Sequence, residues 1–216
     1  MFKKKYFCPQ SVTDVAKGMI ASTHACFPHI RECSFDINSA ALLVIDMQKC
    51  FLDEKYHQVF VPSATSIIPQ INDMVRFFDS KHRPVIYTKH MDDLNDPKMM
   101  GVWWEALVSG EMGDIYSDVN LSKDPLIVEK TQYDAFLKTG LDEILKERGI
   151  KTVVVAGIIM GLCVETSARS AFTHGYRVFL PVDATATGNR ELHEASLMNL
   201  AHGFAHLCLT EDITRD

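Results

Sequence analysis

The sequence predicts an α/β fold of three layers, in which a parallel sheet is covered by helices on both faces. Six short apolar runs alternate along the chain with segments whose apolar residues recur every three to four positions. A continuous apolar run is typical of a strand buried on both faces, as in a parallel sheet. The six predicted strands lie at 41–45, 84–88, 126–128, 151–156, 176–181 and 205–209.

Helices are predicted between these strands. Apolar residues recur at helical spacing over Ile67–Phe78, which predicts an amphipathic helix with one face toward the sheet. A second helix around Leu141–Leu145 stops before Gly149, since glycine is common just past a helix end. Two further helices, over Ala168–Phe172 and Leu192–Leu200, stop at His-Gly pairs.

Two regions do not follow the alternation. Residues 1–38 have weak periodicity, so we interpret them as an N-terminal extension with one short helix near Val12–Thr23, followed by a single domain at 39–216. Residues 89–125 form a long connection, and loops of this length in compact domains are usually functional. We expect these two regions to decide which substrate is bound.

Composition excludes several classes of protein. The chain has 216 residues, of which 47% are hydrophobic and 23% charged, as in globular proteins. Its net charge of −6 argues against a nucleic-acid partner, and the one basic run, Lys3–Lys5, lies at a terminus, where chains commonly fray. No apolar run reaches the roughly 18 residues of a membrane span, so no membrane partner is expected.

The cysteines indicate the compartment. None of the six belongs to a CxxC pair, and their spacing fits neither a zinc site nor a disulfide framework. Free thiols are typical of a reducing environment. We therefore expect a cytoplasmic protein that acts on a small molecule.

Three reactive side chains follow three different predicted strands. Asp46 follows the first, Lys130 the third and Cys163 the fourth. Because ligands bind beyond the carboxyl ends of parallel strands, these side chains are expected to meet there. Each also has an ordinary explanation: a turn aspartate, a solvated lysine and a small buried thiol.

Together these groups fit one chemistry. A carboxylate can take the proton of a thiol, and a nearby ammonium favours the thiolate. Cys163 opens a predicted helix, whose free N–H groups favour a developing oxyanion. The combination predicts acyl transfer from an amide to water without histidine.

The motifs around these residues resemble those of the isochorismatase-like cysteine hydrolases, which include nicotinamidases, N-carbamoylsarcosine amidase, ureidoacrylate amidohydrolase and biuret hydrolase. The resemblance runs over about residues 40–213 and rests on DMQKCF at 46–51, KTQYDAF at 130–136, GIIMGLCVETSARSAF at 157–172 and VDATA at 182–186. It implies a six-stranded parallel sheet with the first strand central. It also implies a homo-oligomer, either a dimer or a tetramer.

The resemblance assigns roles at the site. It implies Asp46 as the base, Lys130 as the charge stabiliser and Cys163 as the nucleophile. It also implies a cis peptide between Ile158 and Ile159, and an oxyanion hole formed by the backbone N–H groups of Ile159 and Cys163.

Departures from the family pattern bear on the substrate. Nicotinamidases carry a metal triad built on Asp-x-His after the second strand, where this chain has Thr88-Lys89-His90-Met91-Asp92. We therefore expect no metal and no cofactor, and an amide other than nicotinamide. Family members often have Thr at the position of Met160. True isochorismatases lack the cysteine, so Cys163 favours the amidase branch.

Further residues are candidates for the substrate pocket. Phe51, His90, Trp103, Trp104 and Tyr133 are expected to form its walls, although aromatic residues are more often part of a core. Gln48 either binds a substrate amide or is a plain turn residue. The acidic cluster at Asp92, Asp93 and Asp96 is interpreted as a solvated loop.

The predicted function is that of a cysteine-dependent amidohydrolase, which cleaves a C–N bond of a small molecule through a thioester acyl-enzyme. Two alternatives remain. One is hydrolysis of a vinyl ether, with Asp46 as general acid and no need for Cys163. The other is a non-catalytic binding domain with the same fold.

Overall fold

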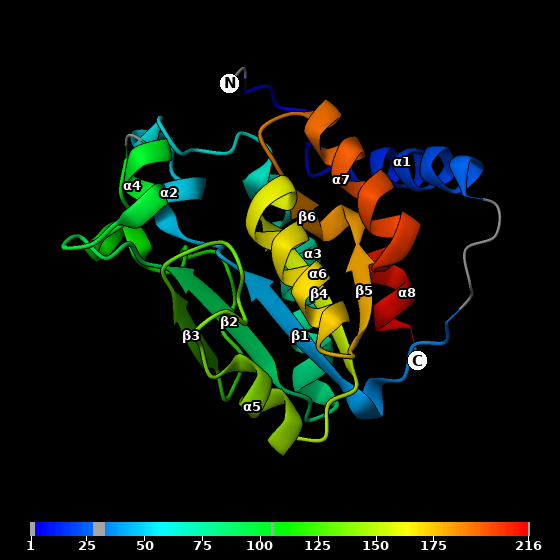
Figure 1. Ribbon diagram of the computed structural model, residues 1–216. Helices are drawn as coiled ribbons and strands as arrows, with labels where there is room; N and C mark the ends of the chain where they lie inside the picture. Colours follow the sequence, from blue (N-terminus) through cyan, green and yellow to red (C-terminus); the bar gives the residue numbers. More distant parts are fainter. Residues whose placement is uncertain (1–2, 28–32, 105, 216) are drawn as a thin grey trace.

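The computed structural model describes residues 3–27, 33–104 and 106–215, and it shows a parallel sheet between two layers of helices (Figure 1). The strand order is β3-β2-β1-β4-β5-β7, and the short strand β6 pairs with β4. The strands are β1 (Ala40–Ile45), β2 (Val85–His90), β3 (Leu126–Lys130), β4 (Thr152–Ile158), β5 (Arg177–Pro181), β6 (Thr185–Ala186) and β7 (His206–Cys208). The predicted three-layer fold and central first strand are confirmed, and β6 is a seventh strand that was not predicted.

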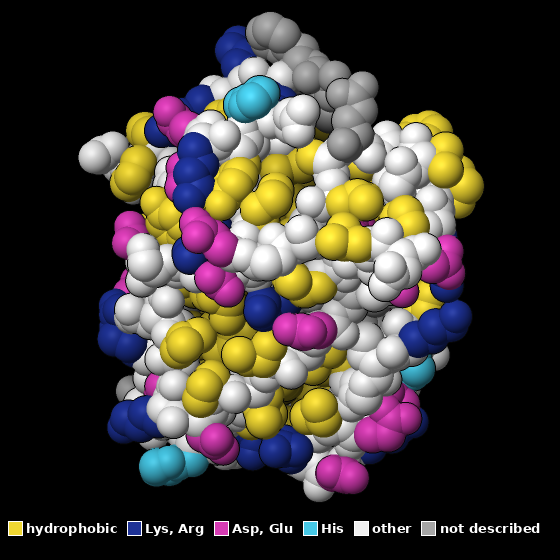
Figure 2. Space-filling view, turned by 90° about the vertical axis from the view of Figure 1, so that its left-hand side faces the viewer, with side chains coloured by type: hydrophobic (Ala, Val, Ile, Leu, Met, Phe, Trp, Pro, Cys, Tyr) yellow, Lys and Arg dark blue, Asp and Glu magenta, His cyan; other side chains and the backbone are white. Residues whose placement is uncertain are grey.

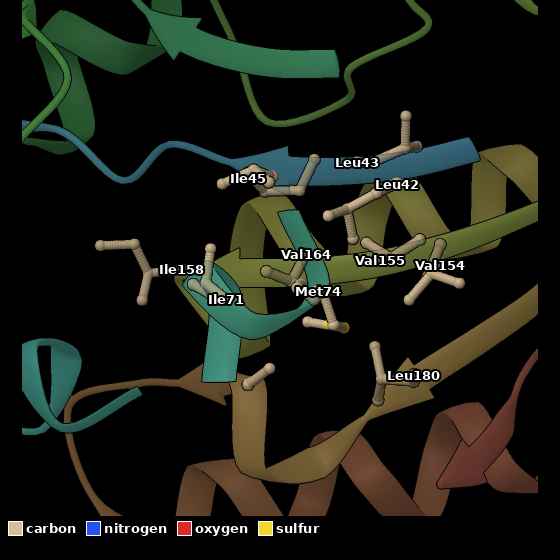
Figure 3. Packing of buried hydrophobic residues seen from close by; sticks show 14 of the residues in the cluster. Leu42, Leu43, Ile45, Ile71, Met74, Val154, Val155, Ile158, Val164 and Leu180 are labelled. Carbon is tan, nitrogen blue, oxygen red and sulfur yellow. The ribbon is translucent and has the colours of Figure 1, made fainter. Parts of the chain in front are cut away.

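Position in the sheet explains the strand sequences. β1 and β4 pair with each other, and every residue of both is buried, which is why each is a continuous apolar run. β3 lies at the edge and alternates in burial, with Ile127 half exposed. In Figure 3, side chains of β1 and β4 meet those of Ile71 and Met74, which lie on α3 (Ile68–Ser80).

The predicted helices are present on the two faces of the sheet. α3 (Ile68–Ser80) packs on β1 with α8 (Thr210–Thr214) beside it. The opposite face carries α5 (Leu141–Glu147), α6 (Glu165–Thr173) and α7 (Arg190–Gly203) (Figure 1). The side chain of Asn189 accepts a hydrogen bond from the N–H of Leu192 at the start of α7, as an N-cap residue does.

The N-terminal region is packed against the rest of the chain. The helix expected near Val12–Thr23 is confirmed as α1 (Val12–Cys26), and α1 contacts α7. Before it, Phe7 is 1% exposed and belongs to the common hydrophobic core. The hydroxyl of Ser63 accepts hydrogen bonds from the N–H groups of Tyr6 and Phe7 at 3.0 and 3.3 Å. The start of the chain thus shares one core with the sheet.

The long connection after β2 folds over the carboxyl ends of the strands. It contains α4 (Lys98–Trp103) and a 3₁₀ turn at Gly110–Gly113, and it lies beside α2 (Lys49–Leu52) (Figure 1). Figure 2 shows this side of the molecule, where apolar side chains gather among charged ones. Large exposed apolar residues include Met99, Val102 and Trp103 on α4 and Ile127 on β3.

Membrane insertion finds no support in the described residues. Within 3–27, 33–104 and 106–215, no helix has both the length and the apolar character needed to cross a bilayer.

Candidate active site

The carboxyl ends of β1, β3 and β4 bring Asp46, Lys130 and Cys163 together. Asp46 follows β1 directly, Lys130 is the last residue of β3, and Cys163 lies in the helical turn after β4. The ammonium of Lys130 donates to Asp46 Oδ2 at 2.6 Å and lies 3.4 Å from Cys163 Sγ. It also donates to the carbonyl oxygen of Gln132 at 3.0 Å. Three residues that are remote in sequence therefore lie close together, with the Lys130 ammonium in contact with the other two.

Asp46 is held by Thr88, a residue to which the sequence assigned no role. The hydroxyl of Thr88 donates to Asp46 Oδ1 at 2.5 Å and accepts from the backbone N–H of Asp46 at 3.1 Å. Thr88 lies in β2 between β1 and β3, and it is 1% exposed. The sequence did offer one indication of this role. The Thr88 hydroxyl lies at the end of the apolar run PVIYT, the next predicted strand after the one that Asp46 follows.

The backbone at Asp46 has an unusual conformation. Asp46 has a φ of 49°, which is uncommon for a residue other than glycine. Gly157 in β4 pairs with Ile45, the residue before Asp46, and a Cβ added at Gly157 would lie 2.2 Å from the carbonyl oxygen of Ile45. Only glycine fits at that position, and its absence of a side chain lets β1 and β4 approach closely beside the site.

Electrostatics at Cys163 differ from the sequence-based expectation. Burial raises the pKa of the Cys163 thiol, and the nearby carboxylate of Asp46 raises it further, while Lys130 opposes both. Lys130 lowers the pKa of Cys163, in the direction expected from the sequence, but burial and Asp46 together raise it by more than Lys130 lowers it. The thiol is protonated and has Asp46 as its hydrogen-bond partner.

Lys130 is charged despite its burial. The side chains of Lys130 and Asp46 are both 0% exposed. Burial alone lowers the pKa of Lys130, but its pairing with Asp46 and its contact with Cys163 outweigh burial, so the net pKa is raised. The site therefore holds a buried ion pair next to a neutral thiol.

The turn that carries Cys163 combines a cis peptide bond with the start of a helical segment. The peptide bond between Ile158 and Ile159 is cis, as the resemblance implies. Residues Met160–Val164 form a π-helical turn that continues into α6, and the carbonyl of Ile159 accepts from the N–H groups of Leu162 and Val164. Cys163 thus lies in the first turn of a helical segment, where backbone N–H groups favour negative charge.

A cavity of about 260 Å³ opens next to Cys163. Cys163 and Ile159 belong to its lining, whereas Asp46 and Lys130 do not, so the thiol is the member of the three that meets the cavity. The lining is mostly apolar. The predicted pocket residues found in it are Phe51, His90, Trp103, Trp104 and Tyr133.

The two tryptophans have different surroundings. Trp104 is partly buried, and its indole N–H donates to the hydroxyl of Tyr133 at 2.7 Å, which fixes both aromatic side chains. Trp103 ends α4 and is 72% exposed, so it borders the cavity from the solvent side.

Gln48 lies outside the cavity. Its amide donates to the carbonyl oxygens of His90 and Gly113, each at 2.9 Å, and accepts from the N–H of His90 at 2.8 Å. It is 0% exposed. Its position differs from the substrate contact expected from the sequence, because these backbone groups occupy its amide.

Asp92 is a further difference from the sequence analysis. Its side chain is 4% exposed and lines the cavity, so it is not part of a solvated acidic cluster. Its Oδ1 lies 3.1 Å from His90 Nε2, and its Oδ2 accepts from the N–H of Val108 at 2.7 Å. Burial favours a higher pKa for Asp92, but its bonds to His90 and Val108 outweigh burial and lower the pKa.

The N-terminal region also reaches the cavity. Lys3 belongs to the lining, and its ammonium donates to the carbonyl oxygen of Gln58 at 2.7 Å. The N–H of Lys4 donates to the carbonyl of Gly188 at 2.8 Å. Residues 3–4 therefore connect two parts of the cavity wall, Gln58 and Gly188. The sequence did not indicate this role, since the Lys3–Lys5 run was expected to lie at a frayed terminus.

In the parts of the chain that the structure describes, no group of three or more His, Cys, Asp or Glu side chains is placed to hold a metal ion.

Comparisons with known proteins identify the family and the fold. Residues 40–212 match the isochorismatase domain family. Nicotinamidase 3 of Arabidopsis thaliana is 40% identical over 185 residues, which cover 82% of this chain and 87% of that protein. A cysteine hydrolase from Pseudomonas syringae pv. phaseolicola 1448A has the same fold, with a TM-score of 0.80 at 22% identity and coverage of 86% of this chain and 95% of the other. N-carbamoylsarcosine amidase from Thermoplasma acidophilum gives a TM-score of 0.71 at 23% identity, covering 80% and 97%.

Proposed function

The chain belongs to the isochorismatase family of hydrolases, and on this premise we propose that it is a cysteine-dependent amidohydrolase. It cleaves the C–N bond of a small carboxamide or carbamoyl compound through a thioester on Cys163. The observation that carries the proposal is the Lys130 ammonium, which lies within reach of both Asp46 Oδ2 and Cys163 Sγ while the thiol borders a cavity.

The first half of the reaction forms the acyl-enzyme. As Cys163 Sγ attacks the carbonyl carbon, the thiol proton passes to the carboxylate of Asp46. The backbone N–H groups of Ile159 and Cys163 bind the oxyanion, and Lys130 remains protonated beside it. When the C–N bond breaks, Asp46 returns the proton to the leaving nitrogen, and ammonia or an amine departs.

The second half consumes water. Asp46, again a carboxylate, takes a proton from a water molecule that attacks the thioester carbonyl. The C–S bond breaks, the acid product leaves, and the proton held by Asp46 returns to Cys163. Because the resting thiol has a raised pKa, proton transfer accompanies attack rather than preceding it.

The cavity supports a small and largely apolar substrate. Its volume of about 260 Å³ and its aromatic walls suit a compact planar amide. The relatives named nicotinamidase and N-carbamoylsarcosine amidase support amide and carbamoyl substrates as a class. Nicotinamide therefore belongs in the first set of test compounds, although the Asp-x-His pattern is missing from this chain.

Substitution of Cys163 tests the proposal. We expect wild-type protein to release ammonia from at least one member of a panel of carboxamides and carbamoyl amino acids. Cys163→Ala should keep the fold and lose that turnover, and mass spectrometry of a rapidly quenched reaction should find the acyl group on the Cys163 peptide. Cys26→Ser, which removes an exposed thiol remote from the cavity, is the matched control.

Two results would contradict the proposal. Full amide turnover by Cys163→Ala would remove the nucleophile from the mechanism. Cleavage of isochorismate by Cys163→Ala at the wild-type rate would favour the vinyl ether reaction instead.

A further inference from the structure

A second cavity lies at the opposite end of the sheet from Cys163. Its volume is about 400 Å³, within the range of small-molecule sites. Its lining includes Pro84, which directly precedes β2, and Leu126, which begins β3. It therefore lies at the amino ends of these strands, whereas the catalytic groups follow carboxyl ends. Among the described residues, the linings of the two cavities have no member in common.

The lining of this second cavity is rich in cations. Arg83, Lys123 and Arg148 come from three segments: the turn before β2, the end of the long connection and the residue after α5. Asp79 and Asp124 also belong to the lining, so the side chains charged at neutral pH leave one positive charge in excess. The whole chain, in contrast, has a net charge of −6. A local excess of positive charge in a concave site favours an anionic ligand.

The cations keep donors that can serve a ligand. Arg83 Nε donates to a carbonyl oxygen of β1 at 3.2 Å, and Arg148 Nη1 donates to a carbonyl oxygen of α5 at 3.5 Å. The carboxylate of Asp79 accepts from the backbone N–H of Lys123, at 3.2 and 3.4 Å from its two oxygens. Because a guanidinium group has five N–H donors, most of those on the two arginines remain available.

Ser122 adds a hydroxyl that the protein itself leaves without a partner. The residue is 7% exposed and lines the cavity. Its Oγ is buried and has no hydrogen-bond partner among the described residues. A buried hydroxyl without a partner costs free energy, so its presence in a cationic cavity points to an acceptor that a ligand brings.

The backbone at Ser122 is held before any ligand binds. Its N–H donates to the hydroxyl of Tyr87 at 2.9 Å, and that hydroxyl donates to the carbonyl oxygen of Asn120 at 2.9 Å. The N–H of Asn120 donates to the side chain of Asn72 on α3 at 2.8 Å. β2 and α3 thus fix the position of this segment, which lowers the cost of ordering it around a ligand.

We propose that this cavity is a second binding site, whose ligand carries a phosphate group, either as free phosphate or as a small phosphate monoester. The guanidinium groups of Arg83 and Arg148 can each bind two oxygens of a phosphate, and Lys123 adds a third positive charge. The Ser122 hydroxyl donates to a further oxygen. Donors from four places suit the several oxygens and nearly double charge of a phosphate better than the single charge of a carboxylate.

NMR titration of the wild-type protein tests this binding. The probes are inorganic phosphate, ribose 5-phosphate and ribose, which lacks the anion. We expect saturable shifts of the amide signals of Ser122 and Lys123 with both phosphates, with a Kd of about 1 mM or lower, and none with ribose. Tighter binding of ribose 5-phosphate would identify a monoester as the ligand, and tighter binding of inorganic phosphate would identify the free ion.

Variants assign the binding to the lining. Lys123→Met/Arg148→Met removes two exposed cations and should raise the Kd for phosphate by at least about tenfold. Lys17→Met/Arg190→Met removes two cations that lie outside the lining and is the matched control for net charge. Its Kd should stay within about twofold of the wild-type value, because distant surface charges are screened.

Ser122→Ala tests the hydroxyl separately. Without phosphate, the melting temperature of this variant should equal or exceed that of the wild type, because the substitution removes a buried hydroxyl that has no partner. With phosphate, the Kd should rise by about threefold to tenfold. Phosphate should therefore raise the melting temperature of Ser122→Ala by less than that of the wild type.

Several results would overturn the proposal. They are the absence of a saturable shift with either phosphate, equal Kd values for Lys123→Met/Arg148→Met and its control, and shifts confined to residues outside the lining. A lower melting temperature of phosphate-free Ser122→Ala would overturn the role of the hydroxyl in binding. Each result can occur whether or not the protein hydrolyses amides, so this proposal and the proposed function succeed or fail separately.

Discussion

The cavity is bordered by two polar networks that differ in completeness. The network behind Cys163 is closed, because the Asp46 carboxylate has donors in Thr88 and Lys130, and Lys130 itself bonds to three neighbours. The network of His90 and Asp92 is open at Nδ1. A closed network holds groups for chemistry and has no capacity for a ligand, whereas an open one is suited to recognition. Under the proposed function, the closed network holds the reacting groups, while the open network retains one unpartnered ring nitrogen.

The largest effect is expected when the closed network loses its cation. Lys130→Met leaves the carboxylate of Asp46 buried and unpaired, which should lower the free energy of unfolding by about 3–5 kcal/mol and abolish turnover. Urea unfolding and an ammonia-release assay measure the two effects. Asp46→Asn/Lys130→Met removes both charges and should recover stability without activity. A Lys130→Met protein as stable as wild type would show that the pair is not isolated from solvent.

A smaller effect is expected at Thr88. Thr88→Val keeps the shape of the side chain but removes the donor to Asp46 Oδ1 and the acceptor for the Asp46 N–H. We expect a loss of about 1–3 kcal/mol in the free energy of unfolding, together with lower kcat. Thr88→Ser retains the hydroxyl and is the matched control. Equal stability of the Val and Ser variants would show that the Thr88 hydroxyl does not stabilise the folded protein through Asp46.

Thiol alkylation probes the charges of the closed network. Since burial and Asp46 raise the pKa of Cys163, its reaction with iodoacetamide should be slow at neutral pH and accelerate as pH rises. Asp46→Asn removes one of the two effects, so alkylation at neutral pH should become faster, by about tenfold for a fall of one pKa unit. Peptide mapping by mass spectrometry follows each cysteine separately, with exposed Cys26 as the internal reference. Slower alkylation in Asp46→Asn would contradict the assigned effect of Asp46.

His193 offers a second buried histidine for comparison with His90. Its two ring nitrogens are both occupied, by the hydroxyls of Tyr6 at 2.9 Å and Thr185 at 3.1 Å. Burial lowers the pKa of His193 to about 3. The unfolded chain therefore binds a proton at this residue that the folded chain does not, between pH of about 6.5 and 3.

Stability should consequently fall as pH decreases through that window, by about 1.4 kcal/mol per pH unit from this one residue. His193→Gln, which has no titrating group, should flatten the dependence measured by urea unfolding at a series of pH values. An unchanged slope would show that His193 is protonated in the folded protein.

Tyr6→Phe should give the smallest effect. It removes a hydroxyl that bonds to His193 Nδ1 and accepts from the N–H of Thr187 at 3.0 Å. We expect a loss of about 1 kcal/mol, seen as a lower melting temperature. An unchanged melting temperature would show that this contact does not hold residues 3–7 in place.

Sequence patterns were sufficient for most of the fold. The apolar runs of β1 and β4 predicted central strands because burial on both faces favours apolar residues at almost every position. β6 was not predicted because it has two residues, which are too few to show the apolar run or the alternation typical of a strand. The meeting of Asp46, Lys130 and Cys163 followed from parallel strands ending at one edge.

The remaining site residues depend on long-range packing. Asp92 lies among other acidic residues in sequence, and its burial arises only when the long connection brings Val108 against it. Lys3 reaches the cavity because the chain start crosses to Gln58 and Gly188. No local pattern encodes such contacts, since each joins segments more than ten residues apart.

The contacts of residues 3–7 have a consequence for how the molecule is assembled. Residues 3–7 are held by Ser63, Thr187 and His193, so their contacts join segments up to 187 residues apart and form only when those distant segments have come together. A fragment that ends before residue 187 would contain Asp46, Lys130 and Cys163 and still lack the partners that anchor the segment leading to Lys3 at the cavity wall.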